Sequence, residues 1–356
     1  MNKKVHNFSA GPSILPDKVF EQASSAIKDF NNSGLSILEI SHRSKDFIEV
    51  LEEARFTALD IAELNKDEYT CLYLQGGASL QFLMTAYNFL NNNAAYINTG
   101  SWSTKAIKEA KMFGVVTEIA SSADKNFNYI PKDLSLNESY DYLHLTSNNT
   151  IFGTQFHSFP DVNYPLFADM SSDIFSRKIN FSKFDLIYAG AQKNLGPAGV
   201  TMVLIRKSLL KNISRQVPSM LSYKIHADKD SSFNTPPVFP IYCVLLNLRM
   251  IKNDGLDNIS SNNDIKSKLI YEEIDNNKCF SGFSHVDDRS QMNATFNLND
   301  GFNGELFNEI CKENNISGIN GHRSVGGYRA SIYNALPIDS VKLLIKCMKE
   351  FESNYN

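Results

Sequence analysis

One segment decides how this chain folds: Asp185-Leu-Ile-Tyr-Ala-Gly-Ala-Gln-Lys-Asn-Leu-Gly-Pro-Ala-Gly-Val-Thr-Met-Val-Leu-Ile-Arg206. Its two apolar runs, 184–189 and 200–205, predict short buried strands. One lysine, Lys193, lies between them in a polar turn that is rich in glycine and also contains a proline. The pattern therefore presents a single amine at the end of a buried strand.

A third apolar run, 165–170, carries one carboxylate, Asp169, near its end. A lysine at a strand end can act as an amine nucleophile if its pKa is depressed. A carboxylate at a neighbouring strand end can keep a pyridinium nitrogen protonated, and pyridoxal phosphate (PLP) enzymes require both groups. Taken alone, Lys193 and Asp169 are more often a solvated loop lysine and a helix cap. The PLP hypothesis therefore depends on the rest of the chain.

Composition indicates a globular protein and excludes several classes. The 356 residues are 42% hydrophobic and 21% charged, which suffices for a large core and favours two domains over one. A net charge of −4 gives no positive field for nucleic acid or an anionic membrane. No apolar run is long enough to span a bilayer, and no signal-peptide pattern follows Met1. The five cysteines form no C-x-x-C, so we expect no metal site or disulfide framework and a cytoplasmic location.

Strands and helices are predicted to alternate through the first 210 residues. Further strands are expected at 69–74, 94–98, 115–119 and 141–146, and helices near 17–30, 47–64, 80–90 and 104–113. This alternation predicts an α/β fold with an open, mainly parallel sheet, in which ligands gather at the carboxyl ends of the strands. The polar candidates at those ends are 76–79, Ser101, Trp102, Thr150, Asp169 and Lys193.

The last third of the chain changes character. An apolar helix is expected at 241–251, and the polar stretch 253–264 is interpreted as a hinge that leads into another helix. Strands at 294–298 and 316–319 and a closing helix at 339–350 follow. We therefore expect a large domain at 14–257 and a smaller α+β domain at 258–356, with residues 1–13 packed near the smaller one.

Several polar groups suit an anionic or aromatic ligand, and each also has a structural interpretation. The turn Gly76-Gly-Ala-Ser79, between a strand and a helix, offers free amides to an anion, but taken alone it is more often a plain tight turn. Trp102 suits stacking on a ring or packing in a core. Thr150 and Gln192 could bond ring substituents or a phosphate, although plain surface polarity is the default for both.

Two His-Arg dipeptides and one further arginine are the remaining candidates: His42, Arg43, His322, Arg323 and Arg329. Arginine binds carboxylate or phosphate with two parallel hydrogen bonds, so several of them indicate an anionic substrate. The alternative is surface salt bridging, which contributes little stability.

These motifs resemble the phosphoserine aminotransferase family, within the class-V, fold-type I PLP enzymes. The matching segments run in order through nearly the whole chain. They are Phe8-Ser-Ala-Gly-Pro, Ser41-His-Arg-Ser, Leu74-Gln-Gly-Gly-Ala-Ser-Leu-Gln-Phe82, Asn98-Thr-Gly-Ser-Trp102, Ala168-Asp-Met-Ser-Ser172, Tyr188-Ala-Gly-Ala-Gln-Lys-Asn-Leu-Gly-Pro-Ala-Gly199, Phe233-Asn-Thr-Pro-Pro237 and Gly321-His-Arg-Ser-Val-Gly-Gly-Tyr-Arg-Ala-Ser-Ile-Tyr-Asn-Ala335.

The resemblance implies a homodimer with a seven-stranded type of sheet in its large domain, and it implies a role for each candidate residue. Lys193 would carry the cofactor covalently, and Asp169 would pair with its ring nitrogen. Trp102 would stack on the ring, and Thr150 would bond its hydroxyl side. The phosphate would be held by Ala78, Ser79 and Gln192, with Asn234 and Thr235 from the partner subunit. The substrate's anionic groups would be bound by His42, Arg43, His322, Arg323 and Arg329.

The activity implied is transfer of the amino group of L-glutamate to 3-phosphohydroxypyruvate, by ping-pong kinetics, in serine biosynthesis. The corresponding keto acid of vitamin B6 synthesis is a further substrate candidate. Ser79 stands where some relatives have arginine, and Ala78 stands where glycine is commoner. The alternatives are another fold-type I enzyme acting on a small amino acid, a cysteine desulfurase, and a non-catalytic PLP-binding protein. None of the five cysteines lies in an obvious active-site loop, which disfavours the desulfurase.

Overall fold

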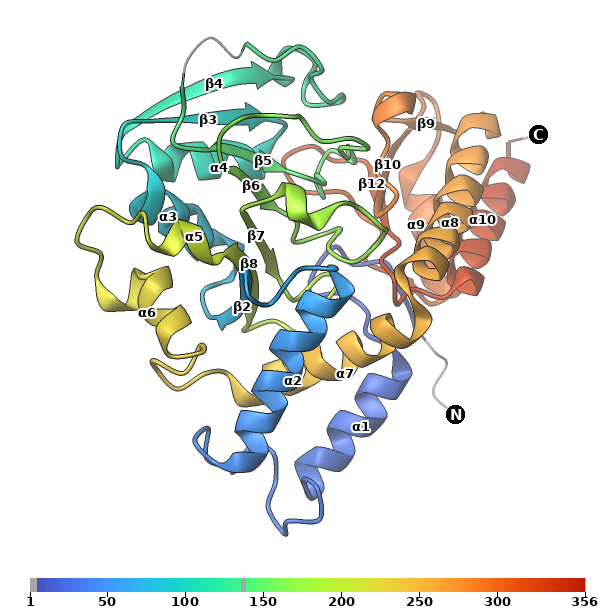
Figure 1. Cartoon of the computed structure of the whole chain (residues 1–356). Coiled ribbons are helices and arrows are strands. Elements are labelled where there is room, and N and C mark those ends of the chain that lie inside the picture. The colour runs from blue at the N-terminus through green and yellow to red at the C-terminus, as the bar shows by residue number, and fades with distance from the viewer. Residues whose placement is uncertain (1–4, 136–138, 356) are drawn as a thin grey trace.

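A computed structural model describes residues 5–135 and 139–355, and its centre is a seven-stranded sheet (Figure 1). The strand order is β2-β8-β7-β6-β5-β3-β4. All neighbours are parallel except the two pairs that involve β8, so the prediction of a mainly parallel α/β sheet is confirmed. The strands are β2 (Tyr69–Leu74), β3 (Asn93–Asn98), β4 (Val115–Ser121), β5 (Leu143–Thr146), β6 (Leu166–Asp169), β7 (Leu186–Gly190) and β8 (Thr201–Arg206).

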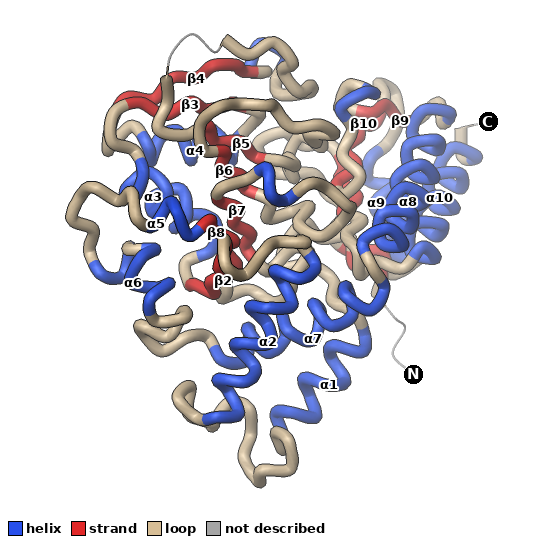
Figure 2. The backbone as a smooth tube through the Cα atoms, viewed as in Figure 1, coloured by secondary structure: helices blue, strands red, loops and turns tan. Residues whose placement is uncertain are grey.

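Both faces of this sheet are covered by helices, which explains why β2, β5, β6 and β7 are buried along their whole length (Figure 2). On one face, Leu186 and Tyr188 of β7 join the core formed with α3 (Gly77–Phe89) and α4 (Ser101–Ala110). On the other face, Ile187 and Ala189 join the core formed with α2 (Lys45–Ile61) and α7 (Val238–Asp254). Alternate residues of one strand therefore belong to different cores.

Six strands end at the same edge of the sheet. β8 is antiparallel to both of its neighbours, so β2 runs in the same direction as β7. β3 to β7 are mutually parallel. The loops after β2, β5, β6 and β7 therefore emerge at this common edge, where ligands bind in such sheets.

A second, antiparallel sheet has the order β12-β10-β9 and lies to the side of the first (Figure 1). Its strands are β9 (Phe280–Gly282), β10 (Asn293–Leu298) and β12 (Tyr328–Ser331). It shares a hydrophobic core with α8 (Leu256–Asn276), α9 (Gly304–Glu313) and α10 (Ile338–Ser353). The chain starts beside this part, because β1 (His6–Asn7) pairs with β11 (Ile316–Ser317) in parallel.

The polar stretch 253–264 is helical over most of its length, so the predicted hinge was wrong there. α7 ends at Asp254, and α8 begins two residues later at Leu256. Gly255, with a φ of 75°, is the joint between the two helices. Most polar residues of the stretch occupy the outer side of α8, although Asn263 is buried. The buried positions of the helix recur at helical spacing: Ile259, Asn263, Lys266, Ser267, Ile270 and Ile274.

The remaining helices are short or peripheral. They are α1 (Asp17–Lys28), α5 (Lys207–Leu210) and α6 (Tyr223–Asp228). Among the described residues, no helix combines the length and the apolar character needed to cross a membrane.

Candidate active site

Lys193 lies in the turn that follows β7, and the first segment of the chain packs against this turn. The amide of Ser13 donates to the Gln192 carbonyl at 2.9 Å, and the Ser13 hydroxyl donates to the carbonyl of Lys193. Gly11 has a φ of 145°, and a Cβ placed there would be 3.2 Å from Lys193 Cγ. The lysine side chain is therefore held between its own turn and a segment that also contacts the second sheet.

Asp169 ends β6, directly beside the strand that leads to Lys193. The carboxylate is buried, and its Oδ1 accepts a hydrogen bond of 2.9 Å from the amide of Ser171. Burial raises the pKa of Asp169, and the nearby Lys193 opposes that rise. Burial lowers the pKa of Lys193; Asp169 opposes this change, and Arg329 adds to it. A lysine with a lowered pKa is more often unprotonated, so it can act as a nucleophile or a base.

Trp102, Thr150 and Arg329 border the same space as the lysine. Lys193 Nζ lies 5.5 Å from the centroid of the Trp102 ring. Trp102 Nε1 donates to the hydroxyl of Thr150 at 2.9 Å, and Arg329 Nη1 donates to the Thr150 carbonyl at 2.8 Å. The structure thus brings together the indole of α4, the guanidinium of β12, and an amine and a threonine from two strand-end loops.

Arg329 also has a buried Nε without a hydrogen-bond partner. A buried donor left unpaired costs free energy, so its presence points to a group that joins it when the site is in use. Burial lowers the pKa of Arg329, but arginine stays protonated in proteins. The missing partner is therefore expected to be an anion.

The turn after β2 is built to present the amino-terminal end of α3. Gly76 precedes the helix with a φ of 85°, and a Cβ there would be 2.6 Å from Leu80 Cβ, so the turn requires glycine. The first amides of a helix have no partner within it, and they carry the positive end of its dipole. Ala78 is partly buried and Ser79 is exposed in this first turn. Their amides suit an anionic group.

Gln192, Asn234 and Thr235 lie close to these elements. The Gln192 side chain turns back over Gly190, where an added Cβ would be 2.8 Å from Gln192 Oε1. Asn234 Nδ2 donates to Gln75 Oε1 at 2.8 Å, and Gln75 Nε2 donates to the Thr235 carbonyl at 3.0 Å. The loop before α7 is thereby fastened to the residue just ahead of Gly76 in the same chain.

His322 and Arg323 lie in the loop before β12, and both are exposed. The His322 ring contacts the hydroxyl of Ser324 at 2.7 Å. Burial lowers the pKa of His322, and the cations Arg329, Lys105 and Arg323 lower it further. These groups therefore form a positively charged cluster beside Trp102.

The structure does not bring His42 and Arg43 to this site within one chain. Both belong to the loop that joins α1 to α2, which lies at the lower end of the view in Figure 1, away from the carboxyl edge of the sheet. Among the described residues, neither side chain forms a hydrogen bond or an ion pair with the groups around Lys193.

Asp173 and Lys105 were missed from the sequence. Asp173 is buried and accepts hydrogen bonds from Gln155 Nε2 at 3.1 Å and from the Ser147 hydroxyl. Burial raises the pKa of Asp173, and its charge favours protonation of Lys193. It lies only four positions after Asp169, so a second carboxylate in one strand-end loop was the available signal. Lys105 follows Trp102 by one helical turn, and that spacing was the signal for it.

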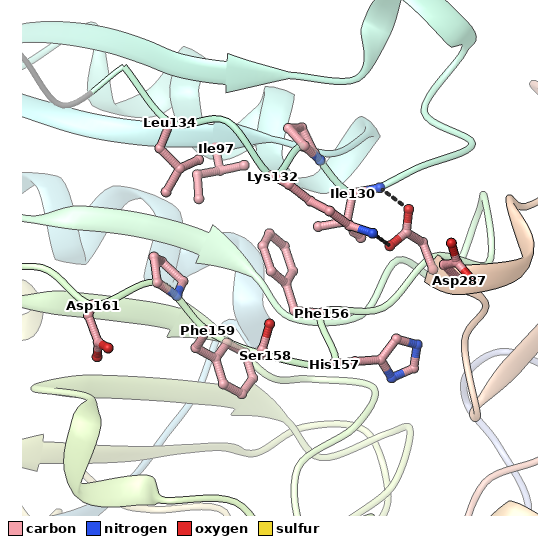
Figure 3. A pocket seen from close by; sticks show the side chains of 13 residues that line it. Ile97, Ile130, Lys132, Leu134, Phe156, His157, Ser158, Phe159, Asp161 and Asp287 are labelled. Atoms are coloured by element: carbon pink, nitrogen blue, oxygen red, sulfur yellow. Dashed lines mark hydrogen bonds and ion pairs between the residues drawn. The ribbon is translucent and has the colours of Figure 1, made fainter.

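A separate pocket of about 430 Å³ contains none of the predicted site residues (Figure 3). Several of its polar groups already have partners: Lys132 pairs with Asp288 at 3.5 Å, and the His157 ring bonds the Arg289 carbonyl at 3.0 Å. Across residues 5–135 and 139–355, no group of His, Cys, Asp and Glu is arranged to hold a metal ion. The cluster around Lys193 is thus the stronger candidate.

Comparisons with known proteins agree on one family. The family model described as aminotransferase class-V matches residues 5–344. The chain is 56% identical to the phosphoserine aminotransferase of Flavobacterium psychrophilum over 353 residues, covering 98% of this chain and 99% of the relative. It is 52% identical to that of Bacteroides fragilis over 353 residues, with coverage of 98% and 99%.

Two solved structures are similar over almost the whole chain. The phosphoserine aminotransferase of Bacillus circulans subsp. alkalophilus superposes with a TM-score of 0.95 at 43% identity, and 99% of each chain is covered. The PLP-bound phosphoserine aminotransferase of Trichomonas vaginalis gives 0.92 at 35% identity, covering 97% of this chain and 100% of that one.

Proposed function

The chain belongs to the class-V aminotransferase family, and we propose that it is a phosphoserine aminotransferase that uses PLP. The observation that carries this proposal is the grouping of the amine of Lys193, the carboxylate of Asp169 and the indole of Trp102 at the carboxyl edge of the sheet. The relatives named above support the specific reaction, since their similarity extends over 98% of the chain.

The residues present fit the cofactor. Its flat ring matches the face of Trp102, and its phosphate matches the free amides at the start of α3, including those of Ala78 and Ser79. The partnerless Nε of Arg329 fits an anionic substrate group rather than a dry core. When bound, PLP supplies an electron sink for the carbanion that forms at the substrate's α-carbon.

The chain's own groups then have three tasks. Lys193 Nζ would hold the cofactor, and the same amine would move the substrate's α-proton as a base and an acid. Asp169 would keep the ring nitrogen protonated, and its burial would strengthen that interaction. Trp102, fixed by Thr150, sets the plane in which a ring can lie.

The positive cluster supports substrates with two anionic ends. L-Glutamate gives its amino group and leaves as 2-oxoglutarate, and 3-phosphohydroxypyruvate takes the amino group and leaves as O-phospho-L-serine. Arg329 is placed for the carboxylate that both amino acids share, because its Nε is buried beside Thr150. His322 and Arg323 are more exposed and suit the far end, where the substrates differ. The reaction would serve serine biosynthesis.

We further infer a homodimer in which His42 and Arg43 serve the site of the second subunit. In the same chain their side chains form no hydrogen bond or ion pair with the described groups around Lys193, so we assign their role in binding to the site of another copy. The same loop exposes Leu35 and Leu38, at 48% and 60%, which is typical of a surface that becomes covered.

Asn234 and Thr235 are proposed to reach the partner's cofactor phosphate. Their loop is fixed in shape by the two bonds to Gln75, while Thr235 and Phe233 remain exposed. A fixed loop with an exposed hydroxyl next to an exposed aromatic ring can contact a neighbouring subunit at little entropic cost.

The domain bounds and the cellular compartment are also proposed. We propose a large domain at 14–257 and a small one at 258–356 with 1–13, supported by the separate hydrophobic core around the second sheet. All five cysteines are buried and unpaired, which supports a reducing compartment such as the cytoplasm.

The test is a coupled assay of 2-oxoglutarate release with L-glutamate as donor. We expect turnover with 3-phosphohydroxypyruvate, and the four-carbon phosphorylated keto acid of vitamin B6 synthesis is assayed in parallel. If only the four-carbon keto acid is turned over, that acid and not 3-phosphohydroxypyruvate is the substrate. If neither acid reacts and glutamate does not change the visible absorption of the PLP-loaded protein, the chain is not an aminotransferase. Sedimentation velocity on the same sample tests the dimer.

A further inference from the structure

Lys105 is an exposed lysine whose ammonium group lies over the ring of Trp102. Its Nζ is 4.5 Å from the centroid of the Trp102 ring, one helical turn away on α4. In the part of the chain that the structure describes, Lys105 forms no ion pair, whereas Lys111 on the same side of the sheet pairs with Glu118 at 3.6 Å. The ammonium group is thus held over the indole ring and is free to meet another anion.

Lys105 also belongs to the positive cluster around His322. Three cations act on that imidazole, from α4, from the loop before β12 and from β12 itself: Lys105, Arg323 and Arg329. No carboxylate is among the groups that shift the pKa of His322. Like charges held together destabilise one another, and a bound anion relieves that repulsion. The cluster is therefore best suited to a group with more than one negative charge.

We propose that Lys105 binds the phosphate at the far end of the substrate, together with His322 and Arg323, and so favours phosphorylated over dicarboxylic amino acids. This inference rests on the proposed function and adds a residue to its site. A lysine is a compact point charge, and it gains more from a phosphate dianion than from a carboxylate monoanion. Lys105 is a binding and specificity residue in this role, with no part in proton transfer.

The experiment compares Lys105→Met with Lys105→Arg and with the control Lys108→Met. Lys108 is an exposed lysine on the same helix, one turn further on. The two half-reactions are followed separately by the visible absorption of the cofactor, with phosphoserine or with glutamate. In Lys105→Met we expect the KM for phosphoserine to rise about 10-fold or more, as for loss of a charged hydrogen bond. The KM for glutamate should rise clearly less, and kcat should change little.

Lys105→Arg should restore most of the affinity for phosphoserine, and Lys108→Met should resemble the wild type. Inorganic phosphate should compete with phosphoserine, and more weakly in Lys105→Met. Equal increases in KM for both substrates, or none for phosphoserine, would overturn the inference.

A second measurement does not depend on turnover. Titration of His322 by NMR should show a higher pKa in Lys105→Met, because a neighbouring cation has been removed. Inorganic phosphate should raise the pKa of His322 in the wild type and less in the variant. If the wild type does not use phosphoserine at all, the proposed function fails, and this phosphate titration still decides the role of Lys105. An unchanged pKa for His322 would place Lys105 outside the cluster.

Discussion

Trp102 Nε1 donates a hydrogen bond of 2.9 Å to the hydroxyl of Thr150, and this bond joins α4 to the loop that follows β5. The same Thr150 accepts from Arg329 through its carbonyl. One small residue therefore fixes both a ring that can stack on a cofactor and a guanidinium that can bind a substrate. Its side chain and its backbone perform these two tasks separately.

Thr150→Val removes the hydroxyl and keeps the shape of the side chain. The Trp102 donor then lacks its partner, which costs about 1–3 kcal/mol if it stays buried. We expect the Kd for PLP to rise by about 5- to 150-fold. Trp102 is the only tryptophan in the sequence, so quenching of its fluorescence measures binding directly. Thr154→Val is the matched control, because the Thr154 hydroxyl is buried in the same loop without a partner. An equal loss in both variants would contradict the prediction.

Lys193→Ala should abolish covalent attachment of the cofactor and nearly all turnover. The reason is that the amine with a lowered pKa beside Asp169 is removed. The measurement is intact mass after borohydride reduction, which retains the mass of the cofactor on the wild type. The control is Lys183→Ala, which removes a lysine that pairs with the exposed Asp161. This variant should retain the mass of the cofactor after reduction. Attachment that persists in Lys193→Ala would show that another lysine carries the cofactor.

Asp169→Asn should lower kcat by about two decades or more, the scale of losing a preorganised electrostatic partner. The amide cannot keep the ring nitrogen protonated, although its size fits the same space. Turnover is measured at saturating PLP, so that weaker binding does not imitate the effect. Asp161→Asn, at an exposed carboxylate, serves as the control. A kcat within a few-fold of the wild type would remove Asp169 from the catalytic residues.

Arg323→Ala should raise the KM for phosphoserine more than that for glutamate. A phosphate dianion depends on charged hydrogen bonds more than a carboxylate does, and losing one costs roughly 1.5–3 kcal/mol, a factor of about 10 to 150. Separate half-reactions give the two values. Arg249→Ala, which removes a surface pair with Glu53, is expected to leave both unchanged. Equal losses for both substrates would make Arg323 a general structural cation.

Lys266 makes stability depend on pH. Its buried Nζ donates to the carbonyls of Ile332, Tyr333 and Leu336 at 3.0, 2.7 and 3.3 Å. Burial lowers its pKa to about 7, below the value of about 10.4 in an unfolded chain. Between these values the unfolded state binds more protons, so Lys266 makes stability rise with pH by up to about 1.4 kcal/mol per unit.

The measurement is urea unfolding at pH 7.5 and 9, in the wild type and in Lys266→Met. The variant leaves carbonyls without a donor and should be less stable at both values. Its stability should nevertheless depend less on pH, and that difference is the diagnostic result. Identical pH dependence in the two proteins would assign the effect to other groups.

The strands of the central sheet could be predicted because each one is encoded by a short, continuous run of residues. Most of the seven strands are short apolar runs, four of them buried along their whole length, and all seven were expected within a few residues of their ends. The helix over 256–276 was missed at its start, because a polar outer face concealed the buried stripe of Ile259, Lys266 and Ile270. The polar composition of this stretch therefore suggested a hinge, although the spacing of its buried residues is that of a helix.

The sequence predicted the position of a site residue only where that residue lies at or just after the end of a predicted strand. Asp169 and Lys193 end neighbouring strands, so the parallel sheet alone brings them close. Lys105 and Asp173 also act on groups of other segments, His322 and Lys193, and their spacing from Trp102 and Asp169 does not reveal those interactions. The distance between His42 and the lysine of the same chain depends on how α1 and α2 pack, which one sequence does not specify.

The segment around Ser13 has a consequence for biosynthesis on the ribosome. It packs on the Lys193 turn while His6 pairs with Ile316, and the Phe8 amide bonds the Ser317 carbonyl at 2.8 Å. At about 5–20 residues per second, these partners emerge roughly 15–60 s after the segment itself. A nascent chain can therefore form much of the large sheet before the segment around Ser13 is fixed against the Lys193 turn. We therefore expect the complete lysine site to form only after Ile316 and Ser317 have been synthesised.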